Sequence, residues 1–133
     1  MPLLFPSATQ TPESVLSAVP SSTSPAQPHY LVFLSSVDPA SGEMWCGDCR
    51  DTQTAIEQLV PDSQSQLVFV GEKSEWKSPD SPWRKAPFNL AAIPTIIKVE
   101  QAQQGALDSS IASAPRLVEG DLRDEAKFKS FVA

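Results

Sequence analysis

Potential metal ligands and disulfide partners are scarce in this chain. Its 133 residues include two cysteines, Cys46 and Cys49, and a single histidine, His29. A structural zinc site needs a closed set of nitrogen or sulfur ligands, so an intramolecular zinc site is not expected from these three residues. A secreted disulfide scaffold of this length would carry several bridges. Both of these structural uses of cysteine are therefore disfavoured.

Clustered basic residues and long apolar segments are also lacking. The formal net charge is −6 and the lysines and arginines are scattered, so nucleic acid and anionic membranes are not expected as partners. No stretch approaches the roughly 18 apolar residues of a membrane-spanning helix. The segment from Met1 to Pro6 has no basic residue and too short an apolar run for a secretory signal. We therefore expect a soluble cytoplasmic protein whose cysteine pair is kept reducible.

The chain length fits one domain over residues 1–133. A chain of this size buries roughly two-thirds of its unfolded surface, which is enough for a hydrophobic core. Prolines are frequent in residues 1–28, where Thr11 as N-cap and Pro12 at the first helical position predict a short helix. A loop rich in serine and proline follows this helix. It leads into the core of the domain, residues 29–133.

Apolar runs and helical periodicity predict alternating strands and helices in the core. The predicted strands are 30–34, 67–70, 95–99 and a short edge strand at 116–118, and the predicted helices run from 46 to 60 and from 121 to the end. The remaining segments are predicted as loops at 35–44 and 72–82, a helical turn within 83–88 and an irregular stretch at 101–113. A helix between two apolar strands is a βαβ unit with parallel pairing. The sequence therefore predicts an open α/β sheet with helices on both faces.

Both cysteines lie in the stretch Trp45-Cys46-Gly47-Asp48-Cys49, at the start of a predicted helix. Two cysteines separated by two residues in that position are typical of dithiol–disulfide exchange. Cys46 would meet unpaired backbone N–H groups and the positive end of the helix dipole, which favour its thiolate, so it is the predicted nucleophile. Cys49 lies one turn further along, and we expect it to be more buried and less acidic. It is the predicted resolving thiol.

Asp48 is expected to modulate the pKa of Cys46. A carboxylate in the first helical turn interacts favourably with the helix dipole by roughly 0.3–1 kcal/mol, but it also places a like charge near the thiolate. Our hypothesis is that Asp48 makes Cys46 less acidic than it would be in a Cys-Gly-Pro-Cys motif. The alternative is that Asp48 only favours the start of the helix.

Three stretches of the sequence together resemble a known family. They are the motif Trp45 to Cys49, the tripeptide Ile93-Pro94-Thr95 and the segment Val70-Gly71-Glu72-Lys73-Ser74-Glu75-Trp76-Lys77-Ser78-Pro79. The chain resembles the thioredoxin superfamily, and more closely the small cytosolic thioredoxin-related proteins of eukaryotes, whose active site reads Trp-Cys-Pro-Asp-Cys. Asp48 fits that subfamily. Gly47 stands where the subfamily has proline and resembles ordinary thioredoxin instead.

The resemblance implies a thioredoxin-like fold, in which a central mixed β-sheet is flanked by helices. It also implies a cis peptide bond before Pro94 and a substrate that pairs with the backbone of Ile93 beside Cys46. Trp45 and Gly47 would complete the substrate-binding set, although Trp45 also fits a half-buried ring that covers the preceding loop. The charged segment after strand 67–70 either lines the rim of the site or is a solvated loop with one buried ring. Its residues in question are Glu72, Lys73, Trp76 and Lys77.

The expected activity is that of a protein-disulfide or small-molecule-disulfide reductase. By resemblance, thioredoxin reductase with NADPH would recharge it, and no bound cofactor or metal is needed. Ordinary thioredoxins carry a buried acid in the strand before the motif, which residues 30–34 do not offer, so the proton of Cys49 would leave by another route. One alternative is a redox-regulated interaction module with little turnover. A further alternative is a zinc site shared between two chains through Cys46 and Cys49.

Overall fold

The computed structural model describes residues 11–17, 19, 23, 26–38, 42–60, 65–85, 88–100 and 107–132. Residues 1–10 and most of the predicted loop rich in serine and proline lie outside the described residues. The predicted first helix is confirmed as α1, which spans Pro12–Ser17. Thr11 precedes it, and its Oγ1 accepts a hydrogen bond from the backbone N–H of Ser14 at 3.2 Å, as an N-cap does.

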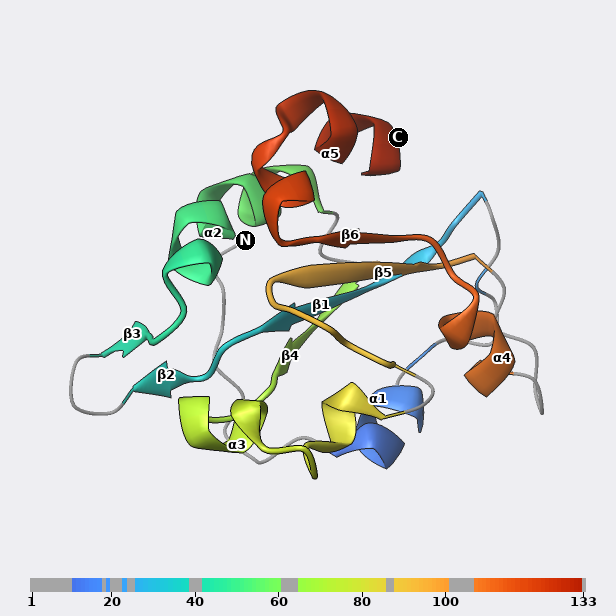
Figure 1. The fold of residues 1–133 in the computed structure, drawn as a ribbon. Coiled ribbons are helices and arrows are strands. Elements are labelled where there is room, and N and C mark those ends of the chain that lie inside the picture. Colours follow the sequence, from blue (N-terminus) through green and yellow to red (C-terminus); the bar gives the residue numbers. More distant parts are fainter. Residues whose placement is uncertain are drawn as a thin grey trace.

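A four-stranded mixed sheet forms the centre of the fold (Figure 1). The strand order is β4-β1-β5-β6, with bounds β1 His29–Leu34, β4 Ser65–Phe69, β5 Thr95–Val99 and β6 Arg116–Val118. β1 pairs with β4 in parallel, whereas β5 pairs antiparallel with both β1 and β6. Helix α2 (Gly47–Leu59) lies in the chain between β1 and β4, so the predicted βαβ unit is confirmed. The predicted edge strand is confirmed as β6.

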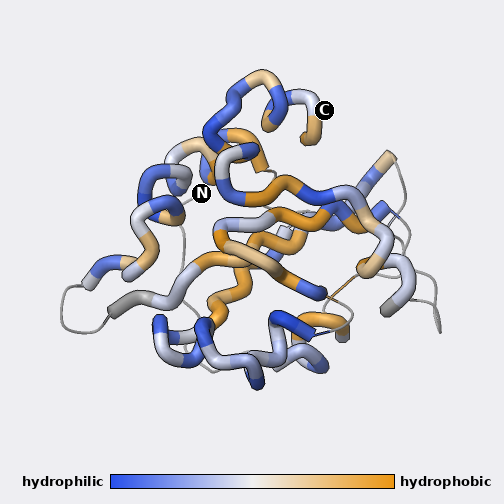
Figure 2. The backbone as a smooth tube through the Cα atoms, in the orientation of Figure 1, coloured by the Kyte–Doolittle hydropathy of each residue, from blue (hydrophilic) through white to orange (hydrophobic). Residues whose placement is uncertain are grey.

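The two central strands carry much of the hydrophobic core. All six residues of β1 are buried, and in β5 only Lys98 is partly exposed. Figure 2 shows these strands mostly in the colour of hydrophobic residues, in the middle of the molecule. An uninterrupted apolar run is what a strand covered on both faces requires. That is why β1 and β5 are recognisable in the sequence.

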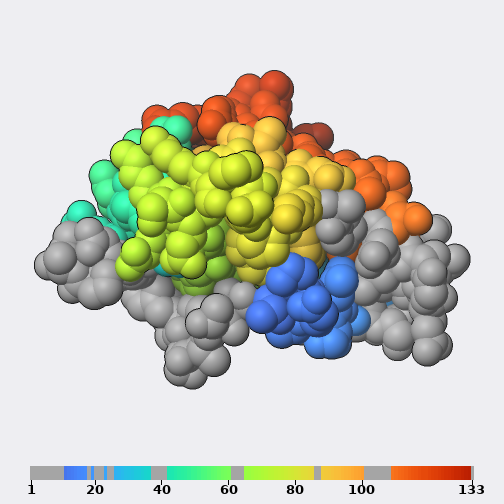
Figure 3. Space-filling view, turned by 60° about the horizontal axis from the view of Figure 1, so that its bottom comes forward, coloured from blue at the N-terminus to red at the C-terminus, as the bar shows by residue number. Residues whose placement is uncertain are grey.

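Helices cover both sides of the sheet (Figure 1). α2 and α5 (Glu125–Val132) lie on one side, and α1 and α3 (Lys73–Lys77) lie on the other. Figure 3 brings the second side forward, where α1 and the segment that begins with α3 form much of the surface. The prediction of an α/β sheet with helices on both faces is confirmed. Within the part of the chain that the structure describes, no helix has the length and apolar character needed to cross a membrane.

Two predicted loops contain regular structure. The segment 35–44 includes a short antiparallel ribbon formed by β2 (Val37–Asp38) and β3 (Glu43–Met44). The segment 72–82 includes α3, which begins with a capping box in which the Glu75 carboxylate accepts the backbone N–H of Glu72 at 3.0 Å. Both predictions were wrong because they rested on the polar composition of the segments. Strand pairing stabilises β2 and β3, and the capping box stabilises α3.

The prediction of an irregular stretch at 101–113 was also wrong where the structure describes it. Helix α4 spans Leu107–Ala112 and packs near β5. Its residue Ile111 is fully buried. Burial of this side chain stabilises a short helix that the polar sequence of the segment does not predict. Residues 101–106 lie outside the described part of the chain.

The predicted C-terminal helix is divided into two elements. A 3₁₀ helix, η3, spans Glu119–Arg123, and α5 follows it. The division occurs at Asp124, whose Oδ1 accepts the backbone N–H of Lys127 at 3.2 Å and so caps α5. The predicted turn within 83–88 is observed slightly earlier, as the 3₁₀ helix η2 at Pro82–Arg84.

Candidate redox site

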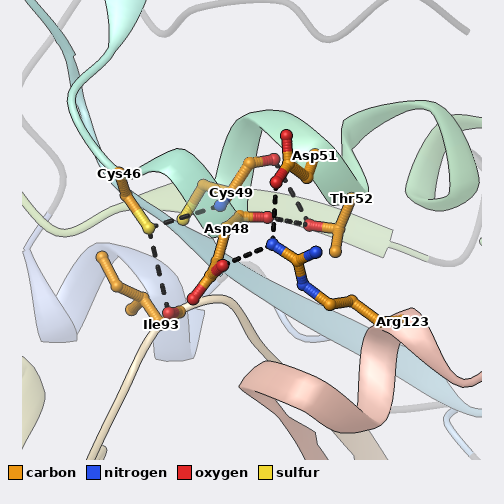
Figure 4. A network of polar contacts seen from close by, with 7 residues as sticks. All are labelled: Cys46, Asp48, Cys49, Asp51, Thr52, Ile93 and Arg123. Atoms are coloured by element: carbon orange, nitrogen blue, oxygen red, sulfur yellow. Dashed lines mark hydrogen bonds and ion pairs between the residues drawn. The ribbon is translucent and has the colours of Figure 1, made fainter.

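Cys46 occupies the N-cap of α2. Its backbone is extended, with φ −87° and ψ 115°, and its Sγ accepts a hydrogen bond from the backbone N–H of Cys49 at 3.3 Å (Figure 4). The N–H of Cys46 itself donates to the Oγ of Ser35, just after β1, at 3.2 Å. The sequence prediction that Cys46 lies at the helix N-terminus is confirmed. The end of a central strand and the start of a helix thus fix the position of this sulfur.

The surroundings of Cys46 favour its thiolate. A hydrogen bond from the Cys49 thiol is the largest cause that lowers the pKa of Cys46, to about 7, and the backbone N–H groups of Cys49 and Asp48 act in the same direction. Partial burial and the charge of Asp48 oppose them. Because the side chain is partly exposed, this thiolate is accessible to another molecule. A nucleophilic thiol requires this combination of acidity and access.

Cys49 has the opposite surroundings. It is fully buried, and its pKa is raised above the ordinary value, first by its hydrogen bond to Cys46 and then by burial. Hydrogen bonds from the backbone and side chain of Ser35 lower the pKa of Cys49, but less strongly. The proton shared by the two thiols therefore stays on Cys49. The expectation that Cys49 is more buried and less acidic than Cys46 is confirmed.

Ser35 was not recognised in the sequence as a site residue. It is fully buried at the end of β1 and contacts both Cys46 and Cys49 through hydrogen bonds. It lies one residue beyond Leu34, the last residue of β1. A serine between a strand and a polar loop carries no sequence signal for this position, because only the fold brings it beneath the cysteine motif.

Ile93 and Pro94 lie opposite the active sulfur. The peptide bond between them is cis, as the resemblance implied. The Sγ of Cys46 lies 3.9 Å from the carbonyl oxygen of Ile93, and Figure 4 shows the two facing each other. Both Ile93 and Pro94 are buried, and the carbonyl of Pro94 accepts the backbone N–H of Glu119 at 2.8 Å. The structure therefore brings this loop to Cys46 and ties it to η3.

Trp45 lies beside the motif as a half-buried ring. Its Nε1 donates to the carbonyl of Gly71 at 3.0 Å, and Gly71 has a φ of 97°, a backbone conformation that favours glycine. With Glu72, Lys73 and Ser74, Trp45 lines a surface hollow of about 340 Å³. The structure thus places Glu72 and Lys73 near the motif.

The rest of the predicted rim is placed differently. Trp76 is buried and lies under the guanidinium of Arg84, 4.1 Å from the ring centroid, and Lys77 is exposed at the end of α3. Gly47 is exposed as the first residue of α2, next to Cys46. Of the charged segment, only its beginning therefore borders the site.

Asp48 takes part in an ion cluster on the outer side of α2. The Nη2 atom of Arg123, in η3, lies 2.5 Å from Oδ1 of Asp48 and 2.7 Å from Oδ2 of Asp51 (Figure 4). These contacts raise the pKa of Arg123, with the Asp48 hydrogen bond as the largest cause. Arg123 was not predicted as a site residue, because 75 positions separate it from Asp48.

Comparison with known proteins identifies the family. A family model described as the thioredoxin domain of thioredoxin domain-containing protein 17-like proteins matches residues 8–124. The chain belongs to this family. It is 30% identical over 106 residues to a thioredoxin domain-containing protein of Schizosaccharomyces pombe, which covers 77% of this chain and 81% of that protein. The resemblance stated from the sequence is thus confirmed.

Two further relatives support the assignment. The thioredoxin-like protein Clot of Arabidopsis thaliana is 28% identical over 102 residues, covering 72% of this chain and 76% of that protein. Thioredoxin domain-containing protein 17 of Homo sapiens is 32% identical over 79 residues, covering 56% of this chain and 63% of that protein. The family and the closely spaced pair Cys46 and Cys49 support a thiol oxidoreductase-type role. Among the described residues, no three histidine, cysteine or acidic side chains are grouped as metal ligands would be.

Proposed function

We propose that this chain is a thiol–disulfide oxidoreductase that reduces disulfides in protein or small-molecule substrates. The observation that carries the proposal is the contrast between two sulfurs in one helical turn. Cys46 is partly exposed and its pKa is lowered to about 7, whereas Cys49 is fully buried and keeps its proton. Near pH 7, roughly half of Cys46 is then thiolate, the form that attacks disulfides.

The proposed reaction has two exchange steps. The Cys46 thiolate attacks one sulfur of the substrate disulfide, so that a mixed disulfide forms and the other substrate sulfur leaves as a thiolate and takes up a proton. Cys49 then loses its proton and attacks Sγ of Cys46, which releases the second substrate thiol. The products are a reduced substrate and a Cys46–Cys49 disulfide, so two electrons have passed to the substrate.

Three groups around Cys46 support substrate binding in this proposal. The carbonyl of Ile93, 3.9 Å from the sulfur, is available to pair with an extended substrate backbone, and Pro94 shapes that loop. The hollow beside Trp45 offers a second contact area, with Glu72 at its charged rim. Gly47 leaves the space next to Cys46 open, since glycine has no side chain.

The reducing equivalents would come from NADPH through thioredoxin reductase, in the cytoplasm, and no bound cofactor is required. An NADPH-coupled assay with thioredoxin reductase tests this, with insulin, cystine and glutathionylated or nitrosylated thiols as acceptors. We expect NADPH consumption with the parent chain and none above background with Cys46→Ser. Equal rates for the two proteins would contradict the proposal.

Mixed-disulfide trapping separates turnover from the alternative of a redox-regulated interaction module. Cys49→Ser keeps the nucleophile but cannot resolve the intermediate, so it should accumulate covalent adducts with substrates that a reductant releases. A binding module would instead show redox-dependent association without such adducts. Metal analysis of the reduced protein tests the third alternative, because a zinc site shared between chains would hold about half a zinc ion per chain.

A further inference from the structure

The ion cluster of Asp48, Asp51 and Arg123 joins two distant parts of the chain next to the candidate redox site. Asp48 lies between the two cysteines, and Arg123 reaches it from η3. The side chains of Arg123 and Asp48 are about half exposed, at 49% and 50%, and Asp51 is 60% exposed. Exposed ion pairs contribute little to stability, because water and salt screen them. A structural contribution of the cluster to folding is therefore small.

The same η3 element also contacts the loop opposite Cys46. The backbone N–H of Glu119, the first residue of η3, donates to the carbonyl of Pro94 at 2.8 Å. η3 thus contacts the cis-proline loop at its beginning and the cysteine helix at its end, through Arg123. This one element therefore connects the loop that faces the Cys46 sulfur with the helix whose N-cap is Cys46.

We propose that Arg123 is a positioning residue of the redox site, which holds the Asp48 carboxylate in the ion cluster and thereby limits the negative charge that the Cys46 thiolate experiences. This inference rests on the proposed function and assigns to it a residue that neither the motif nor the family resemblance indicated. One guanidinium nitrogen spans both carboxylates, so Asp48 is held on the outer side of α2. Without that contact, the half-exposed Asp48 side chain would be free to adopt other rotamers.

Asp48 is the charged side chain that acts on the pKa of Cys46. Asp48 raises the pKa of Cys46, whereas the hydrogen bonds from Cys49 lower it. Arg50, also on α2, directs its guanidinium to the carbonyl of Met44. Glu72 and Lys73, of opposite charge, line the hollow beside Trp45, and neither is among the groups that shift the pKa of Cys46. Charges near this sulfur are therefore few, and the position of Asp48 is consequential.

A double-mutant cycle tests the proposal. The variants are Arg123→Gln, Asp48→Asn and the combination, and the readout is the pH dependence of thiolate absorbance and of Cys46 alkylation in the reduced protein. We expect Arg123→Gln to raise the pKa of Cys46 and to slow alkylation near pH 7 on the order of twofold, a size typical of exposed charges. Asp48→Asn should lower the pKa more in the Arg123→Gln background than in the parent. If it lowers the pKa equally in both backgrounds, the positioning role is overturned.

Two further variants distinguish position from charge. Arg123→Lys keeps the charge but replaces the rigid planar guanidinium, whose Nη2 contacts both carboxylates, with a compact ammonium on a flexible stem, so its Cys46 pKa should lie between those of the parent and Arg123→Gln. A parent-like pKa in Arg123→Lys would mean that charge alone suffices, and would overturn the proposal. Lys129→Gln removes an equal charge from α5, where Lys129 pairs with Glu125 at 2.7 Å, and should leave the pKa unchanged.

The readout also separates this inference from the proposed function. If Cys46 of the parent reacts no faster than free cysteine, the proposed reductase function fails. If Cys46 is acidic but the cycle is additive, only the role of Arg123 fails. Circular dichroism of each variant shows whether it is folded. If Arg123→Gln unfolds, Arg123→Lys takes its place in the cycle and the same two outcomes are distinguished.

Discussion

The inner and outer faces of helix α2 differ in burial, in charge and in the kind of contacts they make. The inner face consists of Cys49, Thr52 and Ile56, all buried against the sheet. The outer face presents Asp48 and Asp51 to solvent and is held by ion pairs to η3. Contacts on the inner face are short-range and dry, whereas those on the outer face are screened by water and salt.

This difference decides which contacts dominate the chemistry of the two thiols. For both Cys46 and Cys49, the hydrogen bond between the thiols is the largest cause of the pKa shift, and burial is the second. The charge of Asp48 is the smallest of the causes that act on Cys46. We conclude that the inner face sets the reactivity of the pair and the outer face adjusts it. Four substitutions or conditions test this ranking.

Truncation of the inner face should have the largest effect. Ile56→Ala removes a side chain that is 2% exposed and should lower the free energy of unfolding by about 2–5 kcal/mol, measured by urea denaturation. Gln58→Ala, on the exposed side of the same helix, is the matched control and should change it by less than about 0.5 kcal/mol. Similar losses for the two variants would contradict the division into faces.

Loss of the Ser35 hydroxyl should affect both stability and resolution. Ser35→Ala leaves the backbone N–H of Cys46 without its acceptor, at a cost of about 1–3 kcal/mol, and removes a hydrogen bond that lowers the pKa of Cys49. Mixed disulfides should therefore persist several-fold longer in a quench-flow assay. Ser36→Ala is the control, because Ser36 Oγ accepts only the N–H of Gly71 among the bonds described. Equal lifetimes in the two variants would argue against Ser35.

The stability of the reduced protein should depend on pH between about 7 and about 8.5. The pKa of Cys46 is lower in the folded state, so its contribution to stability is present above the unfolded pKa and is lost as pH falls through about 7. The pKa of Cys49 is raised, so its contribution is lost as pH rises above the unfolded value.

Stability should therefore increase up to about pH 8.5, by no more than roughly 1 kcal/mol because Cys46 is partly exposed, and should decrease at higher pH as the buried Cys49 begins to oppose folding. Denaturation of the reduced parent and of Cys46→Ser over this range measures it. The variant should lack the increase. An equal increase in both proteins would assign it to other groups.

Removal of the Asp48 charge should have the smallest effect. Asp48→Asn should lower the pKa of Cys46 by a few tenths of a unit, because it removes a like charge but keeps the backbone N–H that favours the thiolate. Proline at this position would remove that N–H as well and would confound the measurement. Asp51→Asn, one turn away, is the control and should shift the pKa less. A higher pKa in Asp48→Asn would contradict the hypothesis.

Much of the fold was predictable because its determinants are local. The apolar runs that became β1 and β5 identify buried strands, and the stripe of Ile56 and its neighbours identifies α2. Helices α3 and α4 were missed. The capping box at Glu72 stabilises α3 and the burial of Ile111 stabilises α4, although the composition of both segments predicts a loop.

In the candidate site, too, some features follow from local sequence and others from tertiary contacts. The sequence by itself determined the spacing of Cys46 and Cys49 and their place at the start of a helix, since covalent distance and helix capping depend on neighbouring residues only. The place of Ile93 opposite Cys46 followed from the family resemblance. Only the tertiary structure decided that Ser35 and Arg123 meet at this motif. These contacts join residues from different strands, loops and helices, and such contacts form when the chain packs, so they leave no periodic or compositional trace in the sequence.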